Sequence, residues 1–494
     1  MATATIPWNH ALSRTPDGAS SGLSHSIFMK TPTNQPPPVS PVTRRIFLKS
    51  GAVLVTGIAA LSPAARSQTN KNSKLQIYHV GVGGSVAPGD RSALKKHPQV
   101  VFTGLCDVDS NALGGVSKEH PEAFTCRDFR DGFEKHVDQF DAVLVCTPDH
   151  NHAVVDLTAL KAGKHVYGQK PLVQQLAEVD AIEKGIQARP NLVTQTGNQR
   201  MGDVGRQTAL DILKRGALGK AIEAHVWVDG PPEGTKGYFW YGGLQDPTPP
   251  PPNIDWPLWL GAAIDAPHRP GLVSLQWRSS WDYGTGQLGD WCTHLLDLIY
   301  FAYDLPSPIA VLSDTHPASD FYHRRFVKST LTYEVSGDRF ATKRFVLHYA
   351  DESQAPSRAS LGLPAGKWPG TGTLVVCEGG VFFAEPTGYP QIWIDGKQVD
   401  PKSMPGGAII AERNHWHSWV DKILGKPDAF VQTPFSYGAR IAEAGLLCSK
   451  AARFPGQELR WDKATLSFTN HEEATKTIVR RAEYRKGFEL PTFA

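Results

Sequence analysis

Lys170, Asp290 and His294 are the residues of this sequence whose types and spacing best suit acid-base chemistry. Asp290, His294 and Asp297 follow the spacing i, i+4 and i+7, so they share one face if the segment is helical. An imidazole beside a carboxylate can act as a general base, and a lysine at a strand end can stabilise an alkoxide. The groups therefore suit removal of a proton from a hydroxyl. A capping aspartate, a structural histidine and a solvated lysine are the alternative interpretation.

A glycine-rich turn follows the apolar run 75–80 and contains Gly81, Gly83 and Gly84. Glycines at a strand-to-helix turn let the backbone approach a pyrophosphate, whose charge the helix N-terminus stabilises. Asp107 ends the next apolar run, where a carboxylate can bind a ribose diol and repels a 2′-phosphate, which favours NAD over NADP. Val86 occupies the third glycine position of the usual pattern, so close packing of helix on strand is in question. A glycine turn that binds nothing is the alternative.

A third apolar run ends in Thr147 and Pro148, and His150 and His152 follow. Ligands bind at the carboxyl ends of strands in parallel sheets, so we expect Thr147, Pro148 and His152 to contact a cofactor. Two histidines at i, i+2 also raise the possibility of a metal. No third ligand with suitable spacing accompanies them, and helix capping or a ribose contact suffices, so no metal site is predicted.

Apolar, β-rich runs alternate with helix-like segments between residues 74 and 200. Strands are predicted at 75–80, 100–106, 142–146, 165–167 and 192–196, and helices at 153–162 and 174–188. This alternation is typical of a doubly wound parallel α/β sheet of the Rossmann type. We therefore assign residues 74–200 to a dinucleotide-binding domain.

The pattern changes after a predicted helix at 204–215. Further strands are expected at 221–228, 329–335, 344–349, 373–378, 381–384 and 391–394. Their short spacing favours antiparallel pairing, so residues 201–494 are predicted to form an α+β domain with an open, mainly antiparallel sheet. The proline run at 247–252 is interpreted as a stiff surface excursion.

Charge and composition exclude several classes of partner. The chain has 494 residues, with 51 Lys and Arg against 48 Asp and Glu, and the charges are scattered, so no nucleic-acid surface is predicted. No apolar stretch reaches the roughly 20 residues that a bilayer span needs, so no stable membrane anchor is expected. The six cysteines form no C-x-x-C pair, and buried thiols are favoured over a disulfide.

The N-terminus carries the features of an export signal. Residues 1–42 are rich in Ser, Thr and Pro and are predicted to be disordered. In segment 43–68, Arg44 and Arg45 precede a modestly apolar stretch and then small residues, the order found in a twin-arginine signal. A chance arginine pair before an apolar helix is the alternative. Export by the Tat machinery predicts a periplasmic or other extracytoplasmic protein.

Together the motifs resemble the Gfo/Idh/MocA family of oxidoreductases, which includes glucose-fructose oxidoreductase and inositol dehydrogenase. The resemblance spans residues 75–490, with Gln169 where the family usually has Glu before Lys170. It implies that Lys170, Asp290 and His294 are catalytic around a nicotinamide and a carbohydrate, and that the protein is a homo-oligomer.

The resemblance and the export signal together imply a tightly bound NAD that is regenerated on the protein. Three activities remain open at this point. They are oxidation of a sugar, cyclitol or glycoside hydroxyl; a redox-neutral glycosidase cycle of oxidation, elimination, hydration and reduction; and carbohydrate binding without catalysis, for which the aromatic cluster 238–241 is suited.

Overall fold

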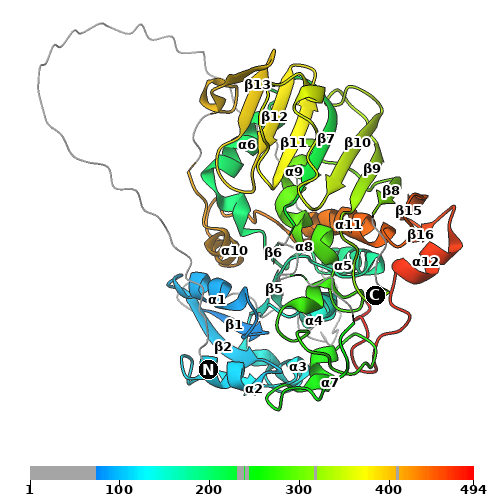
Figure 1. Cartoon of the computed structure of the whole chain (residues 1–494). Coiled ribbons are helices and arrows are strands. Elements are labelled where there is room, and N and C mark those ends of the chain that lie inside the picture. The colour runs from blue at the N-terminus through cyan, green and yellow to red at the C-terminus, as the bar shows by residue number, and fades with distance from the viewer. Residues whose placement is uncertain (1–73, 231–238, 240–243, 316–319, 408–410, 494) are drawn as a thin grey trace, which may run out of the picture. The chain divides into compact units, whose positions relative to one another are not determined.

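The computed structural model of the chain describes residues 74–230, 239, 244–315, 320–407 and 411–493 (Figure 1). The predicted disordered extension 1–42 and the predicted signal segment 43–68 lie outside these residues, as does most of the aromatic cluster 238–241. Within the described part of the chain, no helix is both long and apolar enough to cross a membrane.

The first sheet has six parallel strands in the order β3-β2-β1-β4-β5-β6. They are β1 (Leu75–Val80), β2 (Val100–Cys106), β3 (Phe124–Cys126), β4 (Ala142–Val145), β5 (His165–Gly168) and β6 (Thr194–Thr196). All four residues of β4 are buried, because this central strand has helices over both faces. The prediction of a doubly wound parallel sheet is confirmed, with β3 as an additional short strand.

Five helices connect these strands: α1 (Ala87–Lys95), α2 (Ser110–Ser117), α3 (Phe129–Lys135), α4 (Asp149–Lys161) and α5 (Leu176–Ala188). Helix α2 begins after Asp109, whose side chain accepts hydrogen bonds from two backbone amides of the first turn. Helix α4 begins earlier than predicted, directly after the extended Pro148. Its first turn therefore carries Asp149, His150 and His152 at the carboxyl end of β4.

The second sheet has ten strands in the order β14-β13-β12-β11-β7-β10-β9-β8-β15-β16. Its strands are β7 (Ala221–Trp227), β8 (Ala310–Asp314), β9 (Lys328–Glu334), β10 (Arg344–Ala350), β11 (Gly372–Cys377), β12 (Gly380–Ala384), β13 (Gln391–Ile394), β14 (Lys397–Val399), β15 (Glu458–Asp462) and β16 (Ser467–Phe468). The ladders are antiparallel except that β7 and β10 pair in parallel, so the predicted mainly antiparallel sheet is confirmed.

One face of the second sheet is covered by α8 (Gly286–Leu295) and α11 (Phe435–Ala451), as Figure 1 shows. The hydroxyl of Tyr349 in β10 donates a hydrogen bond to the carbonyl of Leu288 in α8. Helix α11 also packs against α5 of the first domain. The two sheets are thus joined through a shared layer of helices.

Helix α8 ends before Asp297, which begins a separate helix, α9 (Asp297–Tyr303). Asp290 and His294 therefore lie on one helix as predicted. Asp297 does not continue that helix, so the expected single face of three residues is interrupted at Leu296.

The C-terminal part of the chain returns to the first domain. Helix α10 (His415–Ile423) packs on α1, and Trp419 and Val420 are buried against residues of β1, β2 and β4. The remaining helices are α6 (Val204–Lys214), α7 (Trp256–Leu260) and α12 (Glu472–Ile478). The predicted domain boundary at residue 200 therefore separates the strands of the two sheets. Segments beyond residue 411, however, pack against both domains.

The proline-rich segment 244–285 is attached to the edge of the first domain that follows Asp107. Ile254 forms a β-bridge with Asp109, and the amide of Asp255 donates to the carbonyl of Val108. Four tryptophan and tyrosine rings of this segment pack together, and they belong to Trp256, Trp259, Trp277 and Tyr283. All six cysteines are free thiols, and five are buried.

Candidate active site

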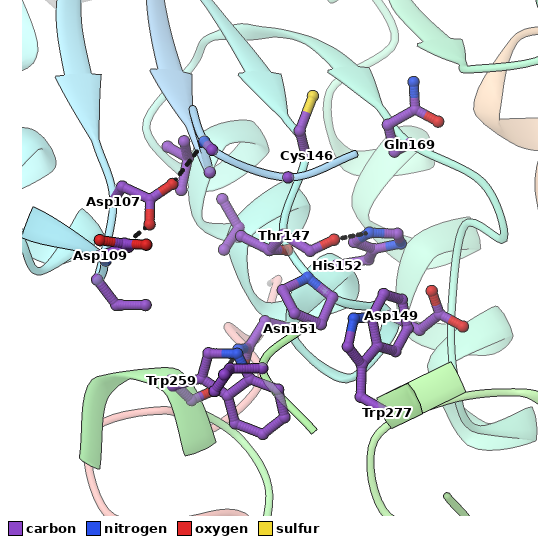
Figure 2. Close-up of a pocket in the computed structure, with 18 of the residues that line it drawn as sticks. Asp107, Asp109, Cys146, Thr147, Asp149, Asn151, His152, Gln169, Trp259 and Trp277 are labelled. Atoms are coloured by element: carbon purple, nitrogen blue, oxygen red, sulfur yellow. Dashed lines mark hydrogen bonds between the residues drawn. The ribbon is translucent and has the colours of Figure 1, made fainter. Parts of the chain in front are cut away.

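A cavity of about 340 Å³ lies at the carboxyl ends of β1, β2, β4 and β5. Every residue predicted to bind the cofactor lines it: Gly81, Gly83, Gly84, Asp107, Thr147, Pro148, His152 and Lys170. Figure 2 shows Thr147 between Asp107 on one side and His152 on the other. Residues from four strand ends thus converge on one space, as the topology of a parallel sheet requires.

Gly81 is required by the backbone at the start of the glycine turn. Its φ of +85° is a left-handed conformation, and a Cβ here would lie 2.7 Å from the carbonyl carbon of Cys146 in the loop after β4. Val86, in the third glycine position, is the N-cap of α1 and packs partly buried against the core beneath it. The missing third glycine therefore does not prevent the helix from packing on the sheet.

Asp107 holds the turn at the position expected for a ribose ligand. Its Oδ2 accepts a 2.7 Å hydrogen bond from the Gly83 amide, and its Oδ1 accepts one of 2.8 Å from the Asp109 amide. Burial raises the pKa of this carboxyl, whereas the two amide bonds lower it. Each carboxylate oxygen can accept a second bond, so the side chain retains capacity for a diol.

His152 joins two loops of the cavity. One ring nitrogen lies 2.7 Å from the carbonyl oxygen of Thr147 (Figure 2), and the other lies 2.7 Å from that of Pro171. Burial lowers the pKa of this histidine. Because both nitrogens contact protein carbonyls, His152 fixes the shape of the cavity wall. His150 contacts the carbonyl of Trp259 at 3.0 Å through its Nε2.

Two segments far away in the sequence complete the cavity wall. Trp259 and Trp277 come from the attached segment 244–285 (Figure 2), and Phe488 comes from the C-terminal tail. The ring of Phe488 packs on Phe129, with the Arg130 guanidinium 4.1 Å from its centroid. The cavity is therefore covered by aromatic side chains on the side away from the sheet.

Lys170 connects the cavity to helix α8. Its Nζ lies 3.0 Å from Oδ2 of Asp290 and donates a 3.1 Å hydrogen bond to the Asp290 carbonyl. The Nε of Arg278 lies 3.6 Å from the other carboxylate oxygen. All three side chains are at least nine-tenths buried, so Asp290 is held between two cations in a place of low polarity.

Gln169, which departs from the resembled pattern, has a specific partner. Its amide donates a hydrogen bond to Oδ2 of Asp90 in α1, and the indole of Trp416 donates to Oδ1 of the same carboxyl at 2.8 Å. Burial raises the pKa of Asp90 to about 6. A glutamate at 169 would face this buried acid, which explains the amide. Because residue 169 is not a glutamate, the carboxylate next to Lys170 comes from Asp290 instead.

His294 is held by Asn198, a residue that the sequence analysis did not identify. The amide nitrogen of Asn198 donates to the carbonyl of Thr293 at 2.9 Å and lies 3.2 Å from Oδ2 of Asp297. This fixes the amide orientation, so its oxygen accepts from Nδ1 of His294 at 3.0 Å. The proton is then on Nδ1, and Nε2 has the lone pair of a base.

Burial and nearby cations set the charge of this histidine. Burial lowers the pKa of His294 well below its usual value, and Arg200 and Lys170 lower it further. The guanidinium of Arg200 lies 5.0 Å from the ring centroid of Trp291, which in turn packs edge-on against His294. The imidazole is therefore neutral, the form that can accept a proton.

Asp149 is a further buried acid beside the Lys170 and Asp290 pair. Burial and the charge of Asp290 raise the pKa of Asp149 to about 8, and the Thr285 hydroxyl donates to it at 2.9 Å. The sequence analysis missed Asn198, Arg278 and Asp149 as members of the site. Only Asp149 had a visible signal, since it follows the predicted strand end at Pro148.

Two family models match the chain. One, described as an oxidoreductase family with an NAD-binding Rossmann fold, matches residues 75–196. The other, described as the C-terminal alpha/beta domain of the same Gfo/Idh/MocA group, matches residues 208–339. Together the two segments make up about half of the chain.

Curated relatives match over shorter segments. Inositol 2-dehydrogenase from Rubrobacter xylanophilus is 30% identical over 155 residues, which are 30% of this chain and 43% of that protein. A glycosyl hydrolase family 109 protein from Saccharopolyspora erythraea is 28% identical over 172 residues, 29% of this chain and 38% of that protein. The matched segments span less than half of the length of these relatives.

A solved structure extends the likeness in fold across most of the chain. The WlbA dehydrogenase from Bordetella pertussis, solved in complex with NADH and UDP-GlcNAcA, has a TM-score of 0.54. It is 13% identical, and the match covers 79% of this chain and 99% of that chain.

Proposed function

Because this chain belongs to the Gfo/Idh/MocA family of oxidoreductases, we propose that it oxidises a hydroxyl of a sugar, cyclitol or glycoside, with NAD as the hydride acceptor. The contact between Lys170 and Asp290 carries the proposal. It brings the wall of the cavity at the strand ends next to the helix that holds a neutral histidine. Neither half of the site could perform this reaction alone.

NAD fits the cavity better than NADP. The glycine turn and the N-terminus of α1 suit the pyrophosphate, and Asp107 suits a ribose with free hydroxyls. When bound, NAD supplies the position that accepts the hydride. The aromatic cover formed by Trp259, Trp277 and Phe488 supports tight retention of the cofactor.

In the proposed reaction, Nε2 of His294 accepts the proton of the substrate hydroxyl. Lys170 stabilises the negative charge that develops on the oxygen, and Asp290 holds the Lys170 ammonium in position. Asn198 keeps the proton of the resting imidazole on Nδ1. A positioned acid or base of this kind contributes about 10² to 10⁴ in rate.

The test uses the variants Lys170→Ala and His294→Ala. Each is expected to retain NAD, measured as nucleotide released on denaturation, while turnover of the substrate falls at least about 100-fold. Gln199→Ala, an exposed neighbour of Asn198, is the control and should keep full activity. Full activity in both Lys170→Ala and His294→Ala would refute the assignment.

A redox-neutral glycosidase cycle is the second candidate, and the match to a glycosyl hydrolase family 109 protein favours it. Transient oxidation, proposed at C3 of the sugar, acidifies the neighbouring C–H. Loss of that proton expels the leaving group, water adds to the double bond, and the hydride returns to the carbonyl. Electrons balance within the cycle, so one bound NAD serves many turnovers.

Incubation of purified protein with disaccharides or aryl glycosides, without added cofactor, distinguishes the two reactions. Release of a monosaccharide or aglycone supports the hydrolytic cycle. Turnover that depends on a second carbonyl substrate or an external acceptor supports net oxidation.

We also propose that the protein is exported already folded by the twin-arginine route and forms a homo-oligomer. The arginine pair at 44–45 supports export, and family membership supports assembly. Arg44→Lys combined with Arg45→Lys should retain the protein in the cytoplasm, and light scattering of the purified chain should give a mass above that of one chain. Unchanged export or a monomeric mass would contradict the respective proposal.

A further inference from the structure

Three side chains with metal-binding atoms lie together on the second sheet, away from the cavity. They are Glu223 and His225 on β7 and His348 on β10, and one ligand atom from each lies within 4.8 Å of the others. Glu223 and His225 are spaced i, i+2 on a strand, so they point to the same face. His348 is the register partner of His225 on the neighbouring strand.

We propose that Glu223, His225 and His348 bind a divalent transition-metal ion of the zinc class. Two imidazoles and one carboxylate are ligands that Zn²⁺ prefers, and three protein ligands leave a fourth position open. In a tetrahedral site with bonds of about 2.1 Å, ligand atoms lie roughly 3.4 Å apart. His225 Nε2 and Glu223 Oε1 are already 2.9 Å apart. Side-chain rotations that move the ligand atoms by about 1 Å bring the cluster to coordination distance.

The surroundings of His348 are those of a metal ligand. The hydroxyl of Thr330 on β9 lies 3.0 Å from its Nδ1, which fixes the ring and leaves Nε2 for the ion. Its ring stacks on that of His225, with centroids 4.8 Å apart.

The site is separate from the proposed catalytic centre. Leu347 and Tyr349, which flank His348 in β10, face the helix layer that includes α8. His348 therefore points to the opposite face of the sheet. A bound ion would tie β7 to β10, a pair that is parallel and thus intrinsically weaker than its antiparallel neighbours.

The sequence analysis predicted no metal because it considered only ligands that are close in sequence. His225 and His348 are separated in the sequence by two strands, β8 and β9, and a long stretch of helix and loop. Only the pairing of β7 with β10 brings them together.

Titration of the full chain with Zn²⁺ after treatment with EDTA tests the proposal. Calorimetry should give one Zn²⁺ per chain, and Co²⁺ should give the visible absorption bands of a low-coordinate nitrogen and oxygen site. His225→Ala, His348→Ala and Glu223→Gln should each weaken binding at least about 10-fold. His136→Ala, which removes a half-buried histidine of the first domain, is the control and should bind like the wild type.

Each variant is checked for folding by circular dichroism and for bound NAD, which should be unchanged because the site faces away from α8. If His348→Ala does not fold, His348→Gln replaces it with a side chain of similar size. A wild-type chain that binds no Zn²⁺, or ligand variants that bind it as tightly as His136→Ala does, would overturn the proposal.

Discussion

The role of Asn198 gives the sharpest test of the catalytic geometry. In Asn198→Ala, the Nδ1–H of His294 loses its acceptor in a buried place, and the carbonyl of Thr293 loses a donor. The proton of the imidazole is then no longer confined to Nδ1. A molecule with the proton on Nε2 has no lone pair directed at the substrate, so we expect kcat to fall.

The magnitude follows from the bonds that are lost. A buried polar group left without its partner costs about 1 to 3 kcal/mol. If this cost appears in the transition state, it corresponds to a decrease in kcat of about 10- to 100-fold. The three hydrogen bonds of Asn198, at about 1 kcal/mol each, also predict a free energy of unfolding lower by about 3 kcal/mol.

The assay compares kcat, KM and the ¹⁵N spectrum of labelled histidine in the wild type, Asn198→Ala and the exposed control Gln199→Ala. We expect the His294 signals of Asn198→Ala to report a mixture of tautomers, with kcat reduced and KM changed little. Bound NAD and circular dichroism show whether the variant is folded. A folded Asn198→Ala with wild-type kcat would show that Asn198 does not control the base.

Three further outcomes are expected. Asp107→Ser removes a carboxylate from the proposed ribose site, so the ratio of the Kd for NADP to the Kd for NAD should fall at least about 10-fold. The two constants are measured by fluorescence after removal of bound cofactor. An unchanged ratio would contradict the assignment. Gln169→Glu should lower the melting temperature, because it places a second buried acid beside Asp90; a variant as stable as the wild type would contradict this account. Burial lowers the pKa of His415 to about 4, so between pH 6.5 and 4 the unfolded chain gains a proton that the folded chain excludes. Stability should therefore fall with falling pH by about 1.4 kcal/mol per unit from this residue, and urea unfolding of His415→Gln should show a correspondingly smaller slope.

The residues around the cofactor cavity could be predicted from the sequence because their signals are local. A glycine turn after an apolar strand, an acid at the end of the next strand and a lysine after a later one each occupy one strand end. The parallel topology then places Gly83, Asp107 and Lys170 around the same cavity without further information.

The partners of the catalytic residues depend on contacts between distant segments and had no local signal. Asn198 follows β6, yet its function comes from His294 on α8. Arg278 reaches Asp290 only because segment 244–285 folds onto the first domain. Periodicity predicted one helix face for Asp290, His294 and Asp297, but the helix is interrupted at Leu296, and Asp297 begins a second helix and forms a buried ion pair with Arg206.

Phe488 lies far beyond the strand ends of the first domain in the sequence, yet it forms part of the wall around the cofactor cavity. This wall can therefore close only after the ribosome has passed the codon for this residue. Loading of the dinucleotide would then follow synthesis of both sheets, and a product truncated before Phe488 would lack this aromatic contact.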